Sequence, residues 1–142
     1  MIIFTLNFLL TILIGSMIFF MTVVSPSVFA TLSTNASSKF LRTIFPRMFL
    51  FGFIITVLSL ILSYISSNIL NSILLIVVAL SFIINRNYLT PKINEFRDRE
   101  MEGDEKASSN FKYMHLLSVL LFILNFIILV SIVIINYFNY NL

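Results

Sequence analysis

The sequence contains no cysteine, which excludes disulfide bonds, thiolate metal sites and cysteine nucleophiles. Charged residues are also scarce, at 11% of the chain against about 25% in a typical soluble domain. Because 59% of the 142 residues are hydrophobic, a soluble fold of this size could not bury its apolar surface. The composition therefore predicts one integral membrane domain, residues 1–142.

Four apolar runs account for most of the hydrophobic residues, and they cover roughly residues 2–24, 48–65, 67–86 and 112–135. A helix needs about 20 apolar residues to cross the hydrocarbon core, and each run is close to that length. Strands of a membrane barrel need only about 10 residues and alternate in polarity. The runs therefore predict an all-α integral membrane four-helix bundle.

The first run has one feature of a cleaved signal peptide, because Val28-Phe29-Ala30 has the form of a signal peptidase site. However, no basic residue precedes the run, and it is longer than the roughly 7–15 apolar residues of a signal peptide. We therefore expect the first helix to be retained.

The nine basic residues lie in two stretches, one between the first and second runs and one between the third and fourth. Because Lys and Arg collect in cytoplasmic loops, both stretches are predicted to be cytoplasmic and both termini external. This placement accounts for the net charge of +3 without nucleic acid as a partner. The expected partner is the lipid bilayer.

The segment 27–46 predicts a short amphipathic helix between the first two spans. Ser37 and Ser38 can cap such a helix, and Lys39 and Arg42 then point away from its apolar face. That face holds Phe40, Leu41, Ile44 and Phe45. We expect this helix to lie in the membrane interface, with an irregular loop as the alternative. Pro46 would then occupy the first turn of the second span.

The cytoplasmic segment 91–108 contains all six acidic residues, together with several basic ones. Pro91 is expected to kink or end the third helix. A solvated helical extension and a mobile loop around Gly103 should follow. A carboxylate metal site is conceivable here, but mixed charge runs are usually solvated surfaces. Ser109 or Asn110 can cap the fourth span.

Three polar residues share one face of the fourth span: His115, Ser118 and Asn125. Polar side chains in a span normally face the bundle and form hydrogen bonds there. His115 is the only histidine, and ionisable groups within spans are functional candidates. A structural hydrogen bond from His115 to a neighbouring carbonyl remains an equal alternative.

Small residues in the second span recur at steps of four, three and four: Gly52, Thr56, Ser59 and Ser63. Such a stripe allows another helix to approach closely. In the first span, Gly15 shares a face with Thr11 and Thr22 and could do the same. Both sets are predicted to serve helix packing.

Three motifs resemble the four-span family of transmembrane protein 205 and its bacterial relatives. They are the stretch from Phe29 to Ile44-Phe45-Pro46, the motif Asn85-x-x-Tyr88-Leu89-x-Pro91, and Asn110-Phe111-Lys112-Tyr113-x-His115-x-x-Ser118. The chain departs from the family where Leu116 replaces a usual Gly and where Asn125 lies further along than the family's Asn.

This resemblance implies a four-span fold in a bacterial inner (plasma) membrane, without a settled activity. It also implies a functional site near the inner ends of the spans. The resemblance points to the neighbourhood of His115, Ser118, Asn85 and Pro91, and the full candidate cluster adds Tyr88, Asn110, Pro46 and Arg47.

Three hypotheses of function follow. The first is a homo-oligomer that aids solute movement or membrane homeostasis, with neutral or weakly charged small-molecule cargo, because no acidic or basic relay lies deep in a span. The second is haem or copper binding through His115, with Met21 and Met48 as further ligands. The third is a scaffold that recruits a partner through the charged loop. No cofactor is expected, and the sequence lacks the residue patterns of an enzyme.

Overall fold

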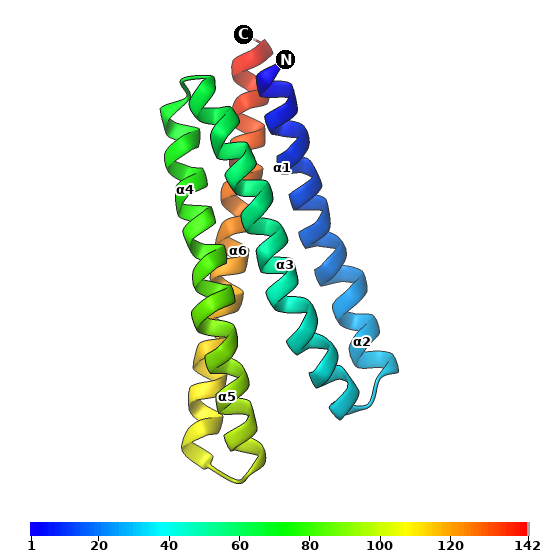
Figure 1. The fold of residues 1–142 in the computed structure, drawn as a ribbon. Helices are drawn as coiled ribbons and strands as arrows, with labels where there is room; N and C mark the ends of the chain where they lie inside the picture. Colours follow the sequence, from blue (N-terminus) through cyan, green and yellow to red (C-terminus); the bar gives the residue numbers. More distant parts are fainter. Residues whose placement is uncertain (142) are drawn as a thin grey trace.

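The computed structural model describes residues 1–141, with side chains to residue 139. Four long helical rods form an antiparallel bundle (Figure 1). The first rod consists of α1 (Ile2–Phe19), the π-helical turn η1 (Phe20–Val24) and α2 (Ser25–Thr31). The second is α3 (Thr34–Ile65). The third joins α4 (Ile69–Ile84), η2 (Asn85–Leu89) and α5 (Thr90–Met101), and the fourth is α6 (Glu105–Asn141).

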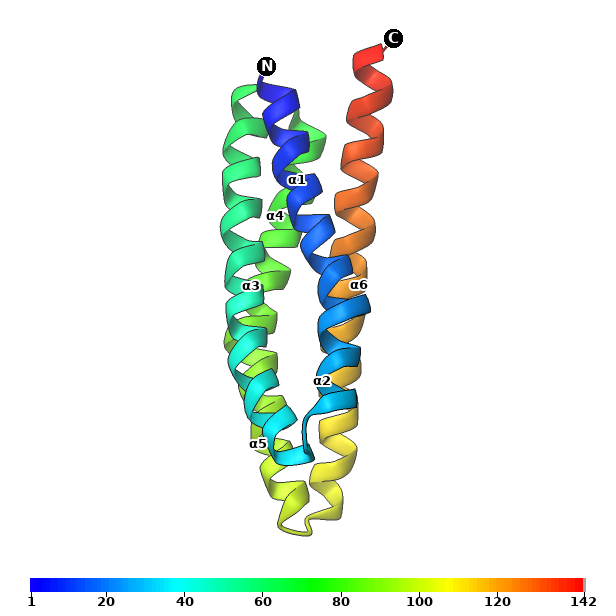
Figure 2. The ribbon, with the colours of Figure 1, turned by 90° about the vertical axis from the view of Figure 1, so that its right-hand side faces the viewer.

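All four rods are long and apolar enough to cross a membrane, which confirms the predicted all-α bundle of four spans. The rods contain 30 to 37 residues. At about 1.5 Å per residue, such rods are longer than the roughly 30 Å of a hydrocarbon core. Both termini lie at one end, which we call the uncharged end (Figures 1 and 2). The α5–α6 connection lies at the other, charged end, where the rods extend past their apolar runs.

The predicted separate interfacial helix is wrong for the described residues. Most of the segment 27–46 belongs to α3, which runs without interruption through Pro46. The helix begins after Ser33, and Ser37 lies inside it, where its hydroxyl donates to the carbonyls of Val28 and Ser33. Two residues of the predicted apolar face, Leu41 and Phe45, line a cleft between the helices.

Each of the three prolines lies inside or next to helical structure at the charged half of the bundle. Pro26 follows η1 and Pro91 follows η2, while Pro46 lies within α3. Proline has no N–H and crowds the carbonyl four residues earlier, so it bends helices or forces a local change of winding. Pro91 does not end the third rod, because α5 continues to Met101.

The uncharged half and the middle of the bundle are tightly packed. Their core is apolar and includes Leu10, Leu75, Leu129 and Ile132, each fully buried. Across the α3–α4 contact, a Cβ at Gly52 would lie 2.7 Å from the Phe82 ring.

The small residues of α3 that follow Gly52, namely Thr56, Ser59 and Ser63, are also buried. Ser63 faces α4, because its hydroxyl lies 3.0 Å from that of Ser72. Gly15 is exposed, and nothing lies within 4 Å of the position that a Cβ would take there, so no described helix packs on it.

Three asparagines tie three rods together at the uncharged end. Asn71 of α4 donates to Asn136 of α6 at 2.7 Å, and Asn136 donates to Asn7 of α1 at 2.8 Å. Amides buried in an apolar bundle need such partners, because no water replaces them. This amide triad therefore holds α1, α4 and α6 close at that end.

Candidate functional site

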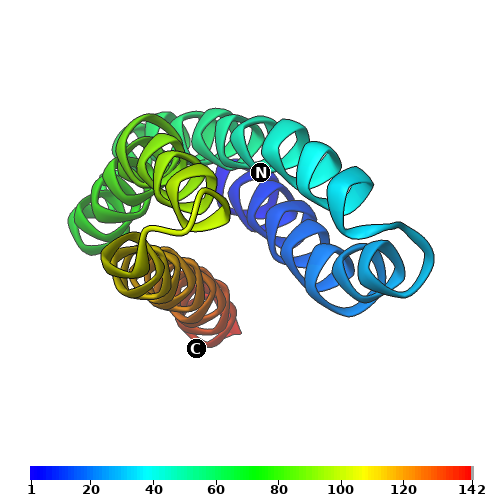
Figure 3. The same cartoon turned by 90° about the horizontal axis from the view of Figure 1, so that it is seen from below.

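The rods diverge toward the charged end and enclose a cleft of about 850 Å³. Seen from that end, α2 and the start of α3 lie on one side, with α5 and the start of α6 on the other (Figure 3). Within the described chain, the backbone of α2 does not come close to α5 or α6, and the backbone of α3 does not come close to α6. The cleft is therefore formed by divergence of the rods, and its volume lies in the range of small-molecule sites.

The wall of the cleft is mainly aromatic and aliphatic. Ring-to-ring contacts run from Phe20 in η1 to Phe45 and Phe49 in α3, with centroids 5.2 and 6.0 Å apart. Phe49 then meets Phe122 of α6 at 6.4 Å. These rings close the inner end of the cleft, because they join the two sides that are separate nearer the mouth.

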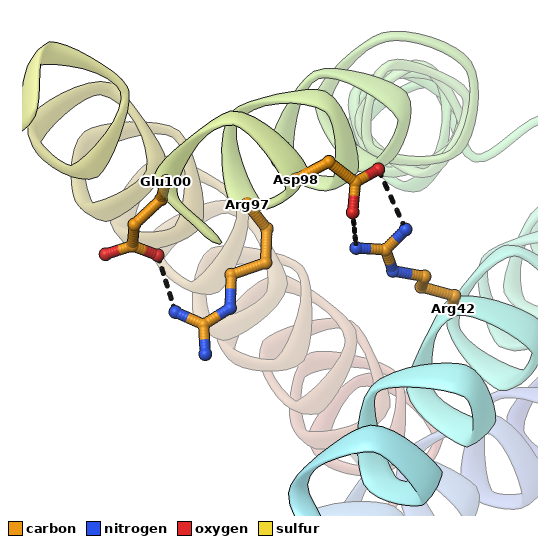
Figure 4. Close-up of polar contacts among 4 residues, drawn as sticks. All are labelled: Arg42, Arg97, Asp98 and Glu100. Carbon is orange, nitrogen blue, oxygen red and sulfur yellow. Dashed lines mark hydrogen bonds and ion pairs between the residues drawn. The ribbon is translucent and has the colours of Figure 1, made fainter. Parts of the chain in front are cut away.

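Charged residues gather at the mouth. Lys39 and Arg42 come from α3, while Arg97 and Asp98 come from α5. The Arg42 guanidinium donates two hydrogen bonds to the Asp98 carboxylate, at 2.5 and 3.0 Å (Figure 4). Such two-point pairing fixes both groups in orientation, and the hydrogen bond from Arg42 lowers the pKa of Asp98.

The Arg42–Asp98 pair is the one ion pair among the described residues that joins the two sides of the cleft. The other pairs lie within α5 or link it to the following turn. Both partners are partly exposed, with 32% and 55% of their side-chain surface accessible. Exposed pairs contribute little to stability and weaken in salt, so this pair adds little to the free energy that holds α3 against α5.

Arg97 and His115 contact the same aromatic ring on the α5–α6 side. The Arg97 guanidinium lies 5.3 Å from the centroid of Phe111, and the His115 imidazole stacks in parallel on that ring at 5.9 Å. Arg97 also donates to Glu100 at 2.5 Å (Figure 4). The ring positions both side chains in the cleft lining.

A polar pair lies deeper in the cleft. The Ser118 hydroxyl donates to the side-chain oxygen of Asn85 at 2.6 Å, and Thr90 donates to the Asn85 backbone carbonyl at 2.7 Å. Ser118 and Thr90 line the cleft, whereas Asn85 is fully buried behind them. The Asn85 amide nitrogen has no partner among the described groups.

The other residues of the candidate cluster lie outside the cleft lining. Tyr88, Pro91, Asn110 and Arg47 are exposed, and Pro46 is partly buried within α3. The structure thus brings together His115, Ser118 and Asn85, and leaves these five apart from them. Asn125 is fully buried in the bundle and does not reach the cleft, and neither atom of its amide has a described partner.

The predicted metal candidates do share the cleft. Met21, Met48 and His115 all line it, and Met101 joins them. Among the described residues, no cluster of three His, Cys, Asp or Glu could hold a metal ion. Any soft-metal site here would therefore depend on thioether sulfur.

The start of α6 differs from the prediction. The capping residue is neither Ser109 nor Asn110, because α6 begins at Glu105 and the Asp104 carboxylate accepts from the N–H groups of Lys106 and Ala107. Asp104 also pairs with Arg99 at 2.6 Å. In the sequence, a Gly followed directly by Asp is the signal for a chain reversal and a helix cap. In the structure, Gly103 has the positive φ of +95° that such a reversal needs.

Residues 8–102 match the DUF4149 family, described as a domain of unknown function. The matched region begins within α1 and ends just after α5, so it includes η1, η2 and the α3 and α5 sides of the cleft. No curated protein and no solved structure matches the chain.

Proposed function

This chain belongs to the DUF4149 family, and we propose that it binds a long-chain amphiphile that enters the cleft sideways from the membrane. The observation that carries the proposal is an apolar cleft whose two sides, η1–α2 and α6, do not pack on each other. The proposal makes the hypothesis of solute movement or membrane homeostasis more specific, because it names long-chain amphiphiles as the cargo.

The side opening is bordered by exposed apolar side chains. Met21 and Phe29 lie on the side of η1 and α2, with 39% and 65% of their surfaces accessible. Val119 and Ile123 of α6 lie opposite, at 39% and 43%. Apolar borders allow an acyl chain to pass from bilayer to cleft without contact with water.

The thermodynamics suit reversible binding. An acyl chain that moves from bilayer to cleft leaves one apolar medium for another, so it gains no hydrophobic free energy. Affinity must then come from packing on the aromatic wall and from polar contacts at the mouth. A ligand held in this way can exchange with the bilayer, as a carrier or a sensor of lipid requires.

The orientation that we propose places the cleft in the inner half of the membrane. The charged end carries all nine basic residues, which favours a cytoplasmic location. The resemblance to the transmembrane protein 205 family supports the same four-span arrangement, and we propose an inner (plasma) membrane location.

A photoreactive acyl chain tests amphiphile binding. Protein reconstituted with a phospholipid that carries a diazirine near the chain end should give adducts at Phe49 and Phe122. These residues line the cleft but are only 3% and 8% exposed, so lipid at the outer surface would not reach them. Adducts confined to lipid-facing residues would remove the proposal.

Two neighbouring substitutions in α6 make the test specific. Val119→Trp should narrow the opening and reduce labelling of Phe49, because Val119 lines the cleft. Leu120→Trp is the matched control, because Leu120 is exposed and lies outside the lining. Equal labelling in both variants would show that the opening is not the path of entry.

Copper binding is a second candidate, because three methionines and the single histidine line the same cleft. Thioether and imidazole ligands suit Cu(I). Titration with Cu(I) against a chromogenic chelator should show binding that His115→Ala and Met48→Leu weaken. If wild-type protein takes no copper from the chelator, this candidate is excluded.

A further inference from the structure

We propose that the cleft selects an anionic phospholipid of the inner leaflet, with Arg42 as the principal headgroup contact and Asp98 as its competitor. This inference rests on the proposed function, because it names the ligand class of the same site. It adds a charge preference, a recognising residue and a residue that opposes binding.

The charge of the mouth favours an anion. The lining contains three cations, Lys39, Arg42 and Arg97, and one carboxylate, Asp98. Glu100 lies outside the lining and pairs with Arg97, so the mouth keeps an excess of one positive charge. A phosphate between them would bring the local charge closer to balance, whereas a cationic headgroup would add to the excess. Near the headgroup layer, each Lys or Arg attracts anionic lipid.

The two arginines are already oriented for oxygen anions. Arg42 reaches across from α3 and holds two carboxylate oxygens at once, which is the geometry that a phosphate also offers (Figure 4). Arg97 gives one nitrogen to Glu100 and is positioned by the Phe111 ring. A guanidinium has five N–H donors, so Arg97 can also donate to a second oxygen anion.

The apolar lining below the charged mouth favours a lipid over a free anion as the ligand. The aromatic wall of Phe20, Phe45 and Phe49 starts at the cations and runs toward the bundle core. Met21 and Val119 also line the cleft and are partly exposed, and under the proposed function the opening between them faces the membrane. A headgroup at Arg42 would therefore have its acyl chain directed into the cleft.

Asp98 occupies the position that a headgroup phosphate would take. Binding must exchange the carboxylate of Asp98 for the phosphate, so the internal ion pair lowers the affinity for lipid. The two partners are therefore expected to have opposite effects when substituted. Arg42→Gln should weaken binding of phosphatidylglycerol about tenfold, the effect of one charged hydrogen-bond contact. Asp98→Asn should strengthen it.

Photolabelling of Phe49 and Phe122 measures this preference with three probes of equal chain length: phosphatidylglycerol, phosphatidylcholine and a free fatty acid. We expect phosphatidylglycerol to label best. Arg47→Gln is the matched control, because Arg47 is on the same helix but exposed and outside the lining. It should leave the labelling unchanged.

The outcomes separate this inference from the proposed function. Equal labelling by phosphatidylglycerol and phosphatidylcholine would overturn the charge preference and leave amphiphile binding in place. Preference for the fatty acid would overturn the phospholipid assignment. Parallel losses in Arg42→Gln and Asp98→Asn would show that the pair only ties α3 to α5. Absence of labelling by all three probes would remove the proposed function itself.

Discussion

Gly52 and Phe82 are in contact so close that the ring occupies the space of a side chain at residue 52. Three ring atoms of Phe82 lie 2.7 to 2.9 Å from the position that a Cβ of residue 52 would take. Gly52→Ala should therefore force α3 away from α4 or displace the ring. We expect a loss of about 1–3 kcal/mol in the free energy of unfolding, as for other overpacked cores.

Thermal unfolding in detergent measures this loss. Gly15→Ala is the matched control, because nothing lies within 4 Å of its added methyl group. Alanine is also the better helix former, so this variant should be as stable as wild type or slightly more stable. Equal unfolding temperatures for both variants would contradict the α3–α4 packing described above.

The amide triad should contribute measurably to stability. Asn136→Leu removes the hydrogen bonds to Asn71 and Asn7, and it leaves two partners unpaired in an apolar environment. Hydrogen bonds between membrane helices contribute about 0.6 kcal/mol on average and at most about 1.7. The variant should unfold at a lower temperature in the same assay.

Asn125 on the same helix gives the opposite expectation. It is fully buried, and neither atom of its side-chain amide has a described partner. Removal of an unpaired polar group from an apolar core relieves its desolvation penalty. Asn125→Leu should therefore match or exceed wild-type stability, and a clear loss would show that the amide has a partner in the folded protein.

These expectations depend on tertiary pairings that the sequence alone does not reveal. The spans could be predicted because each run is long and strongly apolar, which leaves few alternatives. The separate helix predicted for residues 27–46 is wrong because an amphipathic pattern does not reveal what covers its apolar face or whether the helix continues into the next span. Here Leu41 and Phe45 line a cleft formed by the same chain.

The sequence also predicts only part of the candidate site. His115, Ser118 and Asn85 stand out because polar residues are rare within apolar runs. Arg97, by contrast, is one of many charged residues in a segment that the sequence predicts to be solvated. Its role in the mouth depends on the approach of α3 to α5, as in the Arg42–Asp98 contact between residues 56 positions apart. No local pattern encodes such a pairing.

Acidification should loosen the start of α6 through Asp104, which lies outside the spans. The hydrogen bond from Arg99, with that from the Ala107 N–H, lowers the pKa of Asp104. The folded state therefore gains stability above the unfolded-state pKa, about 3.9, and loses it as pH falls through the lower folded-state value.

Hydrogen exchange at the amides of Lys106 and Ala107 measures this effect. Protection relative to Asp104→Asn should be greatest near neutral pH and should shrink as Asp104 becomes protonated. The Asn side chain can still accept a hydrogen bond but cannot pair with Arg99. Identical pH profiles in wild type and variant would exclude a role for the charge.

The absence of native cysteine allows a direct test of the proposed orientation. Asn139→Cys places an exposed thiol near the uncharged end, and Glu102→Cys places one in the turn at the charged end. A membrane-impermeant maleimide added to intact cells should label only Asn139→Cys. Labelling of Glu102→Cys alone would reverse the proposed topology and move the cleft to the outer leaflet.

The amide triad and the Arg42–Asp98 pair fasten opposite ends of the bundle in media of different dielectric constant. Hydrogen bonds among buried amides do not respond to dissolved ions, whereas an exposed ion pair is screened over about 8 Å at physiological ionic strength. Of the two fastenings, only the Arg42–Asp98 pair is therefore sensitive to salt. The distance between α3 and α5 at the charged end is expected to increase with ionic strength, while the amide triad is unaffected.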